Sequence, residues 1–389
     1  MPTLTQLAFD VRWLLLFGLA ACSSKLDLGH DVVVNRTPPD RTLGTPTVPE
    51  AGPPDAAAPP VDAAMVVDAA APAKPLLAPA ERTPSVCVGI PCFEGAVLDL
   101  ATSDGNARGI VMDADNVFWA ATAGMELMQT AKDGSVASGT GTPSGGPFSI
   151  GADDINVYFT SPSGGYVAST PKFKPRLGPK LPLITIIASG EPSPSGILVA
   201  SDGVYFSDDQ AGTIKRVVSQ KVETLVTGLS SAAELAIDAH ALYYTDSALG
   251  EIHALDRLSK KDTLLASGLD HPVAPFVSGD VLYFLELGTP AKAYNDGRLR
   301  RMPLAGGPSE VLVEQLDSPR CLAVDTAAVY LCTRGTSRNG YKGKIVRLGD
   351  DGQISTLALD QAEPFAIAVD GTGVYWTTDA DNALHAILR

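Results

Sequence analysis

A short aromatic strand recurs seven times along the chain, and this repetition constrains the fold more than any other feature. The stretch GVYFSD, residues 203–208, has close copies at intervals of 38 to 47 residues. A repeat of about 40 to 45 residues built of short strands is typical of a β-propeller, in which each unit is one four-stranded blade. The sequence therefore predicts an all-β, seven-bladed β-propeller. The aligned pairs are Phe118–Trp119, Tyr158–Phe159, Tyr205–Phe206, Tyr243–Tyr244, Tyr283–Phe284, Tyr330–Leu331 and Tyr375–Trp376.

The last repeat predicts how the ring closes. It stops at Arg389 after its third strand, so its blade lacks an outer strand. Residues 95–101, GAVLDLA, precede the first repeat and have the pattern of that missing strand. We expect this N-terminal strand to complete the seventh blade, which removes the exposed edges of an open array. This arrangement favours seven blades over six or eight.

The aromatic strands resemble a known repeat. Tyr205-Phe-Ser-Asp208, Tyr243-Tyr-Thr-Asp246 and Tyr375-Trp-Thr-Thr378 are similar to the YWTD propeller repeat of the low-density lipoprotein receptor group, with a secondary likeness to NHL repeats. The resemblance covers about residues 95–389 and implies the propeller fold, although the receptor propellers have six blades. Because these repeat residues belong to the blade core, the resemblance implies no particular function.

Polar residues at matching repeat positions are expected to be structural. Asp113, Asp238, Asp325 and Asp370 end apolar strands just before the aromatic ones. We expect them to cap the turn between the two strands through the backbone, and metal binding is the alternative. The histidines are scattered along the chain and form no recognisable catalytic pattern.

Residues 1–22 look like an export signal. The apolar run from Trp13 to Ala21 is too short to span a bilayer as a helix, and Leu19-Ala-Ala-Cys22 resembles the lipobox of bacterial lipoproteins. The resemblance implies cleavage before Cys22, lipidation of that cysteine and membrane attachment through the lipid. Ser23 favours the outer membrane of a bacterial cell envelope. The alternatives are a plain signal peptide or a buried strand.

A proline- and alanine-rich segment, residues 23–85, separates this signal from the propeller, which we place at 86–389. The segment has no aromatic residue and cannot bury enough apolar surface to offset its ordering entropy. We expect a disordered tether that holds the propeller away from a membrane, and a linker without a spacing role is the alternative. The net charge of −15 argues against a general affinity for nucleic acid, with a local basic patch as the alternative. We expect a monomer.

Four cysteines besides Cys22 fall into two local pairs. Cys87 and Cys92 precede the first blade, whereas Cys321 and Cys332 lie on adjacent strands of the sixth repeat. If the turn aligns Asp325 with Ala328, the second pair faces across the two strands, at a separation that suits a disulfide. Two disulfides would suit an exported protein, and reduced buried thiols are the alternative.

The first strands begin near the mouth of the central channel, where propellers bind ligands. Four residues near the starts of these strands are suited to binding an anionic or planar group: Arg108, Phe148, Arg320 and Phe365. The alternative is that they are simply rim residues.

A second candidate region is the segment 332–347, which we call the blade-six loop. It contains basic residues and no acidic one, although the whole chain is strongly acidic. With basic residues from the neighbouring segment 287–302, it predicts docking of an anionic ligand or acidic protein, and solubilising surface charge is the alternative. The residues expected to bind are Arg334, Arg338, Tyr341 and Lys342.

Two functional classes fit these observations. We favour a binding scaffold for a protein, peptide or glycan without a cofactor. The alternative is a metal-dependent hydrolase or lyase similar to the propeller lactonases or streptogramin lyases. Such an enzyme needs several carboxylates, asparagines or histidines converging on a divalent metal. Only Glu234 stands near the strand starts, with Glu363 and His271 further out, which is too sparse to identify a metal site.

Overall fold

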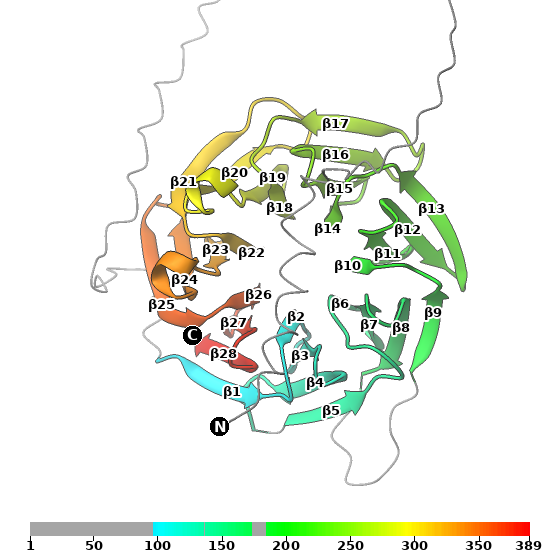
Figure 1. Cartoon of the computed structure of the whole chain (residues 1–389), viewed down its shortest axis with the longest axis horizontal. Helices are drawn as coiled ribbons and strands as arrows, with labels where there is room; N and C mark the ends of the chain where they lie inside the picture. The colour runs from blue at the N-terminus through cyan, green and yellow to red at the C-terminus, as the bar shows by residue number, and fades with distance from the viewer. Residues whose placement is uncertain (1–95, 136, 173–183) are drawn as a thin grey trace, which may run out of the picture. The chain divides into compact units, whose positions relative to one another are not determined.

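The computed structural model describes residues 96–135, 137–172 and 184–389, which form a ring of seven four-stranded antiparallel sheets (Figure 1). The signal, Cys22, the tether and the Cys87–Cys92 pair lie outside the described residues. Within them, no helix is both long and apolar enough to cross a bilayer. The predicted all-β, seven-bladed propeller is therefore confirmed.

The strands follow the repeat in order. Blades one to four contain β2 (Ala107–Met112), β3 (Asn116–Ala121), β4 (Glu126–Ala131) and β5 (Ala137–Gly141); β6 (Ile150–Ala152), β7 (Asn156–Ser161), β8 (Tyr166–Pro171) and β9 (Thr185–Ser189); β10 (Pro194–Ala200), β11 (Gly203–Asp208), β12 (Thr213–Val218) and β13 (Lys221–Thr227); and β14 (Ala232–Ile237), β15 (Ala241–Asp246), β16 (Glu251–Asp256) and β17 (Asp262–Ala266).

The remaining blades follow the same order, with two short 3₁₀ helices between strands. Blades five to seven contain β18 (Pro272–Ser278), β19 (Val281–Glu286), η1 (Pro290–Lys292), β20 (Gly297–Pro303) and β21 (Glu310–Leu316); β22 (Pro319–Val324), β23 (Ala328–Thr333), η2 (Ser337–Asn339), β24 (Lys342–Gly349) and β25 (Ile354–Ala362); and β26 (Pro364–Val369), β27 (Gly373–Thr378), β28 (Ala383–Leu388) and β1 (Leu98–Thr102).

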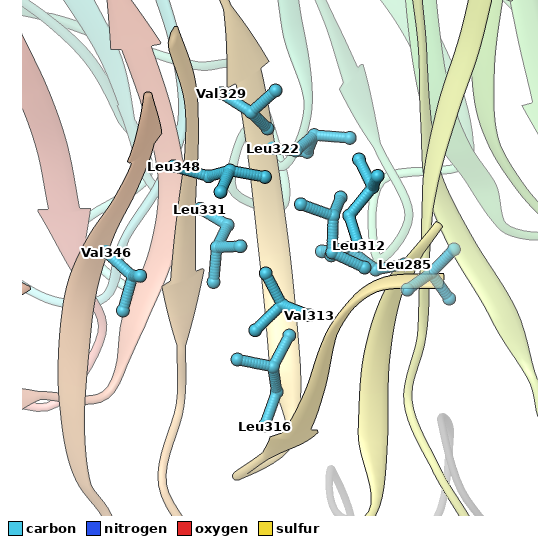
Figure 2. Packing of buried hydrophobic residues seen from close by; sticks show 11 residues of the cluster. Leu285, Leu312, Val313, Leu316, Leu322, Val329, Leu331, Val346 and Leu348 are labelled. Carbon is cyan, nitrogen blue, oxygen red and sulfur yellow. The ribbon is translucent and has the colours of Figure 1, made fainter. Parts of the chain in front are cut away.

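The core lies between neighbouring blades. A blade packs on both sides, so its second strand is buried on both faces, as in β11 and β27. Between blades five and six, leucines and valines from both sheets fill the interface (Figure 2). The repeated aromatic residues belong to these interfaces, because Trp376 and its equivalents are almost fully buried, as are the equivalents of Tyr205 except the partly buried Tyr158 and Tyr283.

Two polar positions of the repeat have distinct structural tasks. The Thr160 hydroxyl donates a 2.7 Å hydrogen bond to the Ser195 carbonyl of the next blade, and Ser207 and Thr377 make equivalent bonds. The carboxylate of Asp208, one position later than Ser207, accepts hydrogen bonds from backbone amides, including one just before its own first strand. In blades two, three and seven the third residue of the motif therefore joins neighbouring blades, and in blade three the fourth residue fixes the loop within the blade.

The expected turn caps are present. The side chain of Asp238 accepts hydrogen bonds from the amides of His240 and Ala241, and Asp113, Asp325 and Asp370 make equivalent contacts. Asp113, Asp325 and Asp370, together with Asp202 in the corresponding turn of blade three, also link blades by ion pairs with basic residues of the following blade. The pairs are Lys172–Asp113, Arg257–Asp202, Arg389–Asp325 and Lys132–Asp370.

The N-terminal strand closes the ring as predicted. β1 pairs antiparallel with β28, and Leu98 lies opposite Ala386. His385 stacks on Trp376, and its Nδ1 lies 2.7 Å from the carboxylate of Asp99 on β1. His253 repeats this arrangement inside blade four, where it stacks on Tyr244 and contacts an aspartate of the outer strand. The two histidines are therefore structural links between third and fourth strands.

Replacing His385 with alanine should therefore lower the free energy of unfolding more than the matched change His253→Ala. Each change removes hydrogen bonds of the imidazole, which are part-buried or buried for His385 and exposed or part-buried for His253. Leaving a buried partner unsatisfied costs about 1–3 kcal/mol. Only β1 is joined to its blade without a connecting hairpin, so its detachment also opens the ring. Urea denaturation followed by tryptophan fluorescence measures both losses. Equal losses in the two variants would contradict this role in closure.

The turn carboxylates also make stability depend on pH. Burial opposes ionisation of Asp325, but hydrogen bonds from Arg389 and from the amides of Ala327 and Ala328 outweigh it, so the pKa of this carboxyl is lowered. Its contribution to stability is complete above the unfolded pKa of about 3.9. That contribution is lost as the pH falls through the lower folded-state pKa.

The variant Arg389→Gln tests this linkage. At pH 7 it should lower the Tm by roughly 1 to 3 °C, because a partly buried ion pair is lost. The difference from the unmodified protein should shrink below about pH 4, where Asp325 becomes protonated. Arg338→Gln is the control, because Arg338 is exposed and forms no ion pair with a described residue. Calorimetry at several pH values measures both variants, and a pH-independent difference for Arg389→Gln would contradict the linkage.

Candidate functional site

The channel mouth is built from irregular starts of the first strands. In six blades the register between first and second strands shifts near this start. Such a bulge leaves a residue unpaired and re-aims its side chain. Arg108, Arg320 and Phe365 all lie within these shifts, between paired neighbours.

The four residues predicted at the mouth come together. The guanidinium carbon of Arg108 lies 5.4 Å from the ring centroid of Phe148 and 5.2 Å from that of Phe365. The two rings meet edge to face at 5.6 Å, and the guanidinium of Arg320 lies 4.5 Å from the Phe365 centroid. We call these residues the Arg–Phe cluster. It joins blades one, two, six and seven.

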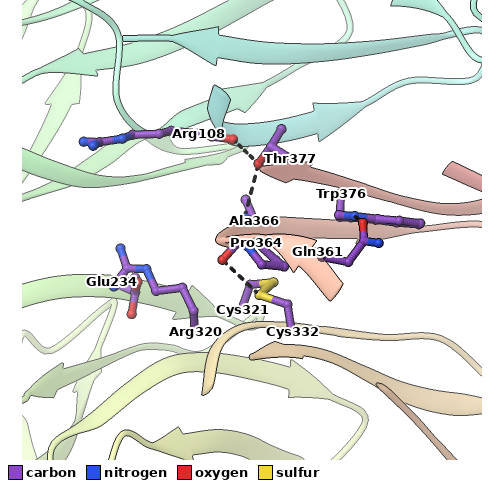
Figure 3. Close-up of a disulfide and its surroundings, with 10 residues drawn as sticks. All are labelled: Arg108, Glu234, Arg320, Cys321, Cys332, Gln361, Pro364, Ala366, Trp376 and Thr377. Atoms are coloured by element: carbon purple, nitrogen blue, oxygen red, sulfur yellow. Dashed lines mark hydrogen bonds and ion pairs between the residues drawn. A yellow bond between two sulfur atoms is a disulfide. The ribbon is translucent and has the colours of Figure 1, made fainter. Parts of the chain in front are cut away.

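Carboxylates hold both arginines. Arg108 donates two hydrogen bonds to Asp379, at 3.1 and 3.2 Å. Glu234 lies 3.9 Å from Arg320 as an ion pair and accepts a 2.7 Å hydrogen bond from the amide of Ala274 (Figure 3). Sequence reasoning missed Asp379 as a partner of Arg108, because 271 residues separate them. No local motif signals such a contact.

Arg320 occupies the most unusual electrostatic position in the cluster. Burial lowers the pKa of its guanidinium, with the positive charges of Arg334 and Arg108 adding to this effect and Glu234 and Asp379 opposing it. Placing several guanidinium groups close together in a partly desolvated site favours an anion there.

The predicted disulfide of blade six is present beside the cluster. Cys321 and Cys332 are bonded and lie directly opposite each other in the sheet, with a Cα–Cα distance of 5.1 Å. Cys321 follows Arg320 in the chain, so this covalent bond ends within one residue of the cluster (Figure 3).

The blade-six loop lies at the end of β23 and contains η2. Its acidic partners come from other segments, because Arg334 bonds Glu363 at 3.0 Å and Lys342 lies 3.6 Å from Asp360. Arg338 is exposed without an ion pair to any described residue, and Tyr341 is 42% exposed. The segment therefore combines paired cations with an exposed arginine and tyrosine.

The neighbouring basic residues of blade five are also held by carboxylates. Arg298 and Arg300 both bond Glu286, which is almost completely buried. The two loops contact each other where Thr336 donates a hydrogen bond to Asn295. The positive charge that the sequence places on these loops is thus largely balanced by residues that the sequence alone could not pair with them.

The residues considered for a metal do not converge. Glu363 is engaged by Arg334, and the His271 ring contacts Tyr294 edge to face. Across the described ranges, no three or more His, Cys, Asp or Glu side chains form a group suited to a metal ion. Where the first and last blades meet, Asp379 accepts hydrogen bonds from Arg108, and the side chain of Asn382 accepts one from the amide of Asn106.

The fold is similar to several solved structures. No protein family and no curated protein matches the chain by sequence. Virginiamycin B lyase from Staphylococcus aureus is 17% identical, with a TM-score of 0.63 over 76% of this chain and 98% of the lyase. A streptogramin B lyase has 14% identity and the same score and coverage. The WD40 propeller domain of Doa1 has 14% identity and a TM-score of 0.60 over 75% of this chain and 96% of that domain. Likeness at these identities establishes the propeller fold alone.

Proposed function

We propose that this protein is a propeller binding scaffold whose ligand presents an anionic group beside a planar one at the Arg–Phe cluster. The observation that carries the proposal is the convergence of two guanidinium groups and two phenylalanine rings from four blades. These groups are assembled at one place in a chain whose net charge is −15. Guanidinium groups bind carboxylates through charge-assisted hydrogen bonds, and aromatic rings pack against planar groups.

The cluster is preorganised for this task. Asp379 holds Arg108 through two hydrogen bonds, and Phe148 is buried, so little side-chain entropy remains to be lost on binding. Arg320 meets Glu234 without a hydrogen bond, since 3.9 Å exceeds hydrogen-bonding distance. A ligand carboxylate that approaches Arg320 would compete with Glu234 for its guanidinium through a charge-assisted hydrogen bond.

The wider proposal places this scaffold outside the cell membrane. Lipidation at Cys22 and the segment 23–85 would tether an exported propeller to a bacterial envelope, where a protein, peptide or glycan is the available kind of ligand. The exposed Arg338 and Tyr341 of the blade-six loop give a larger ligand a second contact next to Arg334. An acidic peptide or an acidic glycan fits both regions.

A fragment titration tests the cluster. Benzoate, which is anionic and planar, should bind the full chain more tightly than acetate or benzamide, which each lack one of these properties. Arg320→Gln should weaken benzoate binding roughly 10-fold, the effect of losing one hydrogen bond to a charged group. Arg301→Gln is the matched control. Arg301 forms an ion pair with Glu310 and lies near the C-terminal end of β20, away from the Arg–Phe cluster. Ligand-observed NMR measures the affinities, and equal losses in both variants would refute the site.

The enzymatic alternative requires a metal and makes a different prediction. If the protein is a scaffold, the full chain purified without chelator should hold no divalent metal in a stoichiometric amount. Elemental mass spectrometry measures this content directly. One calcium, magnesium or zinc ion per chain would instead support a metal-dependent lyase or hydrolase and would direct a substrate screen to the channel mouth.

A further inference from the structure

Blade six departs from the repeat at one position that matters for the cluster. The third residue of the aromatic motif is Thr160 in blade two, Ser207 in blade three and Thr377 in blade seven. In each case its hydroxyl donates to the carbonyl of a mouth residue in the next blade. In blade six this position is Cys332, which is fully buried.

The bond of Cys332 runs within the blade. Its partner Cys321 directly follows Arg320, and the register shift that contains Arg320 ends at the cystine. The sulfur of Cys332 also lies 3.7 Å from the carbonyl oxygen of Pro364, the residue before Phe365 (Figure 3). The disulfide therefore contacts the backbone on both sides of the Arg320–Phe365 stack.

Resting on the binding function proposed above, we propose that the Cys321–Cys332 disulfide is a positioning element for Arg320. It fixes the end of the bulge from which Arg320 extends, and it thereby keeps the guanidinium over Phe365 and next to Glu234. A side chain held in its binding geometry loses less conformational entropy on binding. The ligand affinity of the cluster then depends on the oxidised state of this pair.

Reduction of the disulfide leaves the contact between blades six and seven in place. A dithiol such as dithiothreitol supplies two electrons and two protons, the S–S bond breaks and two thiols form. The thiol of Cys332 can then donate to the Pro364 carbonyl, one residue before the mouth position whose carbonyl accepts the hydroxyl in blades two, three and seven, so a contact to blade seven remains. The bulge that contains Arg320 is then no longer fixed by a covalent bond at Cys321. Because Cys321 is 7% exposed and Cys332 is fully buried, reduction requires local opening of the blade.

Two double variants separate positioning from stability. Cys321→Ala with Cys332→Thr removes the disulfide but restores the hydroxyl of the repeat, whereas Cys321→Ala with Cys332→Ala restores nothing. In the full chain, the Nε–H NMR resonance of Arg320, assigned by its loss in Arg320→Gln, reports the ring current of Phe365. We expect this resonance to move toward the value of an unstacked arginine in both variants. The resonance of Arg108 should stay in place because Asp379 still holds its side chain.

Affinity and stability complete the test. Benzoate affinity should fall at least 5-fold in both variants, while urea denaturation should show that Cys332→Thr recovers stability relative to Cys332→Ala. The proposal would be overturned if the Arg320 resonance did not move in either variant. It would also be overturned if the threonine variant recovered the resonance position and the benzoate affinity together with its stability. If a variant does not fold, the unmodified protein reduced with dithiothreitol gives the same two readouts, with intact mass confirming the reduction.

The two proposals fail in different ways. If benzoate binds no form of the protein but the Arg320 resonance moves on loss of the disulfide, the positioning is supported and the proposed ligand chemistry is wrong. If benzoate binds and the loss of the disulfide changes neither readout, the binding function stands and the positioning role is refuted.

Discussion

Burial of the second strand between neighbouring blades is the constraint on which the whole structure depends. Each of these strands is hydrogen-bonded on both edges and packed on both faces, so its central positions carry large apolar and aromatic residues. A single blade cannot bury both faces by itself, and stability requires a neighbour on each side. The ring satisfies this requirement for the first and last blades only if the two ends of the chain meet.

The seam where the ends meet also supports the candidate site. Thr377 bonds the backbone carbonyl of Arg108, and Asp379 bonds its side chain. Asn106, two residues earlier, donates its backbone amide to Asn382 across the same seam. Closure of the ring and placement of Arg108 are therefore parts of one set of contacts. An anionic ligand at the Arg–Phe cluster would bridge the seam and stabilise the closed ring by mass action.

The period of the repeat made the fold predictable, because it records which residues share a position in successive blades. It gave the blade number, the closing strand, the turn caps and the partner of Cys332, all of which are contacts within a blade or between its ends. The repeat period does not indicate which side chains of different blades contact each other. Glu363 and Asp379 were therefore not recognised as partners of Arg334 and Arg108, although these contacts decide the charge of the site.

The uneven distribution of mouth residues argues for a ligand held to one side of the channel. On blades three, four and five the equivalent positions are Ser195, Ala233 and Val273, which offer little charge or aromatic surface. Arginine and phenylalanine occupy the same positions on blades one, two, six and seven. The residues that hold the blades together recur around the ring, whereas most mouth positions are free to differ because their side chains leave the ladder at a bulge, as at Arg108, Arg320 and Phe365. Binding specificity can therefore arise on one side of the ring without disturbing the packing that holds the ring closed.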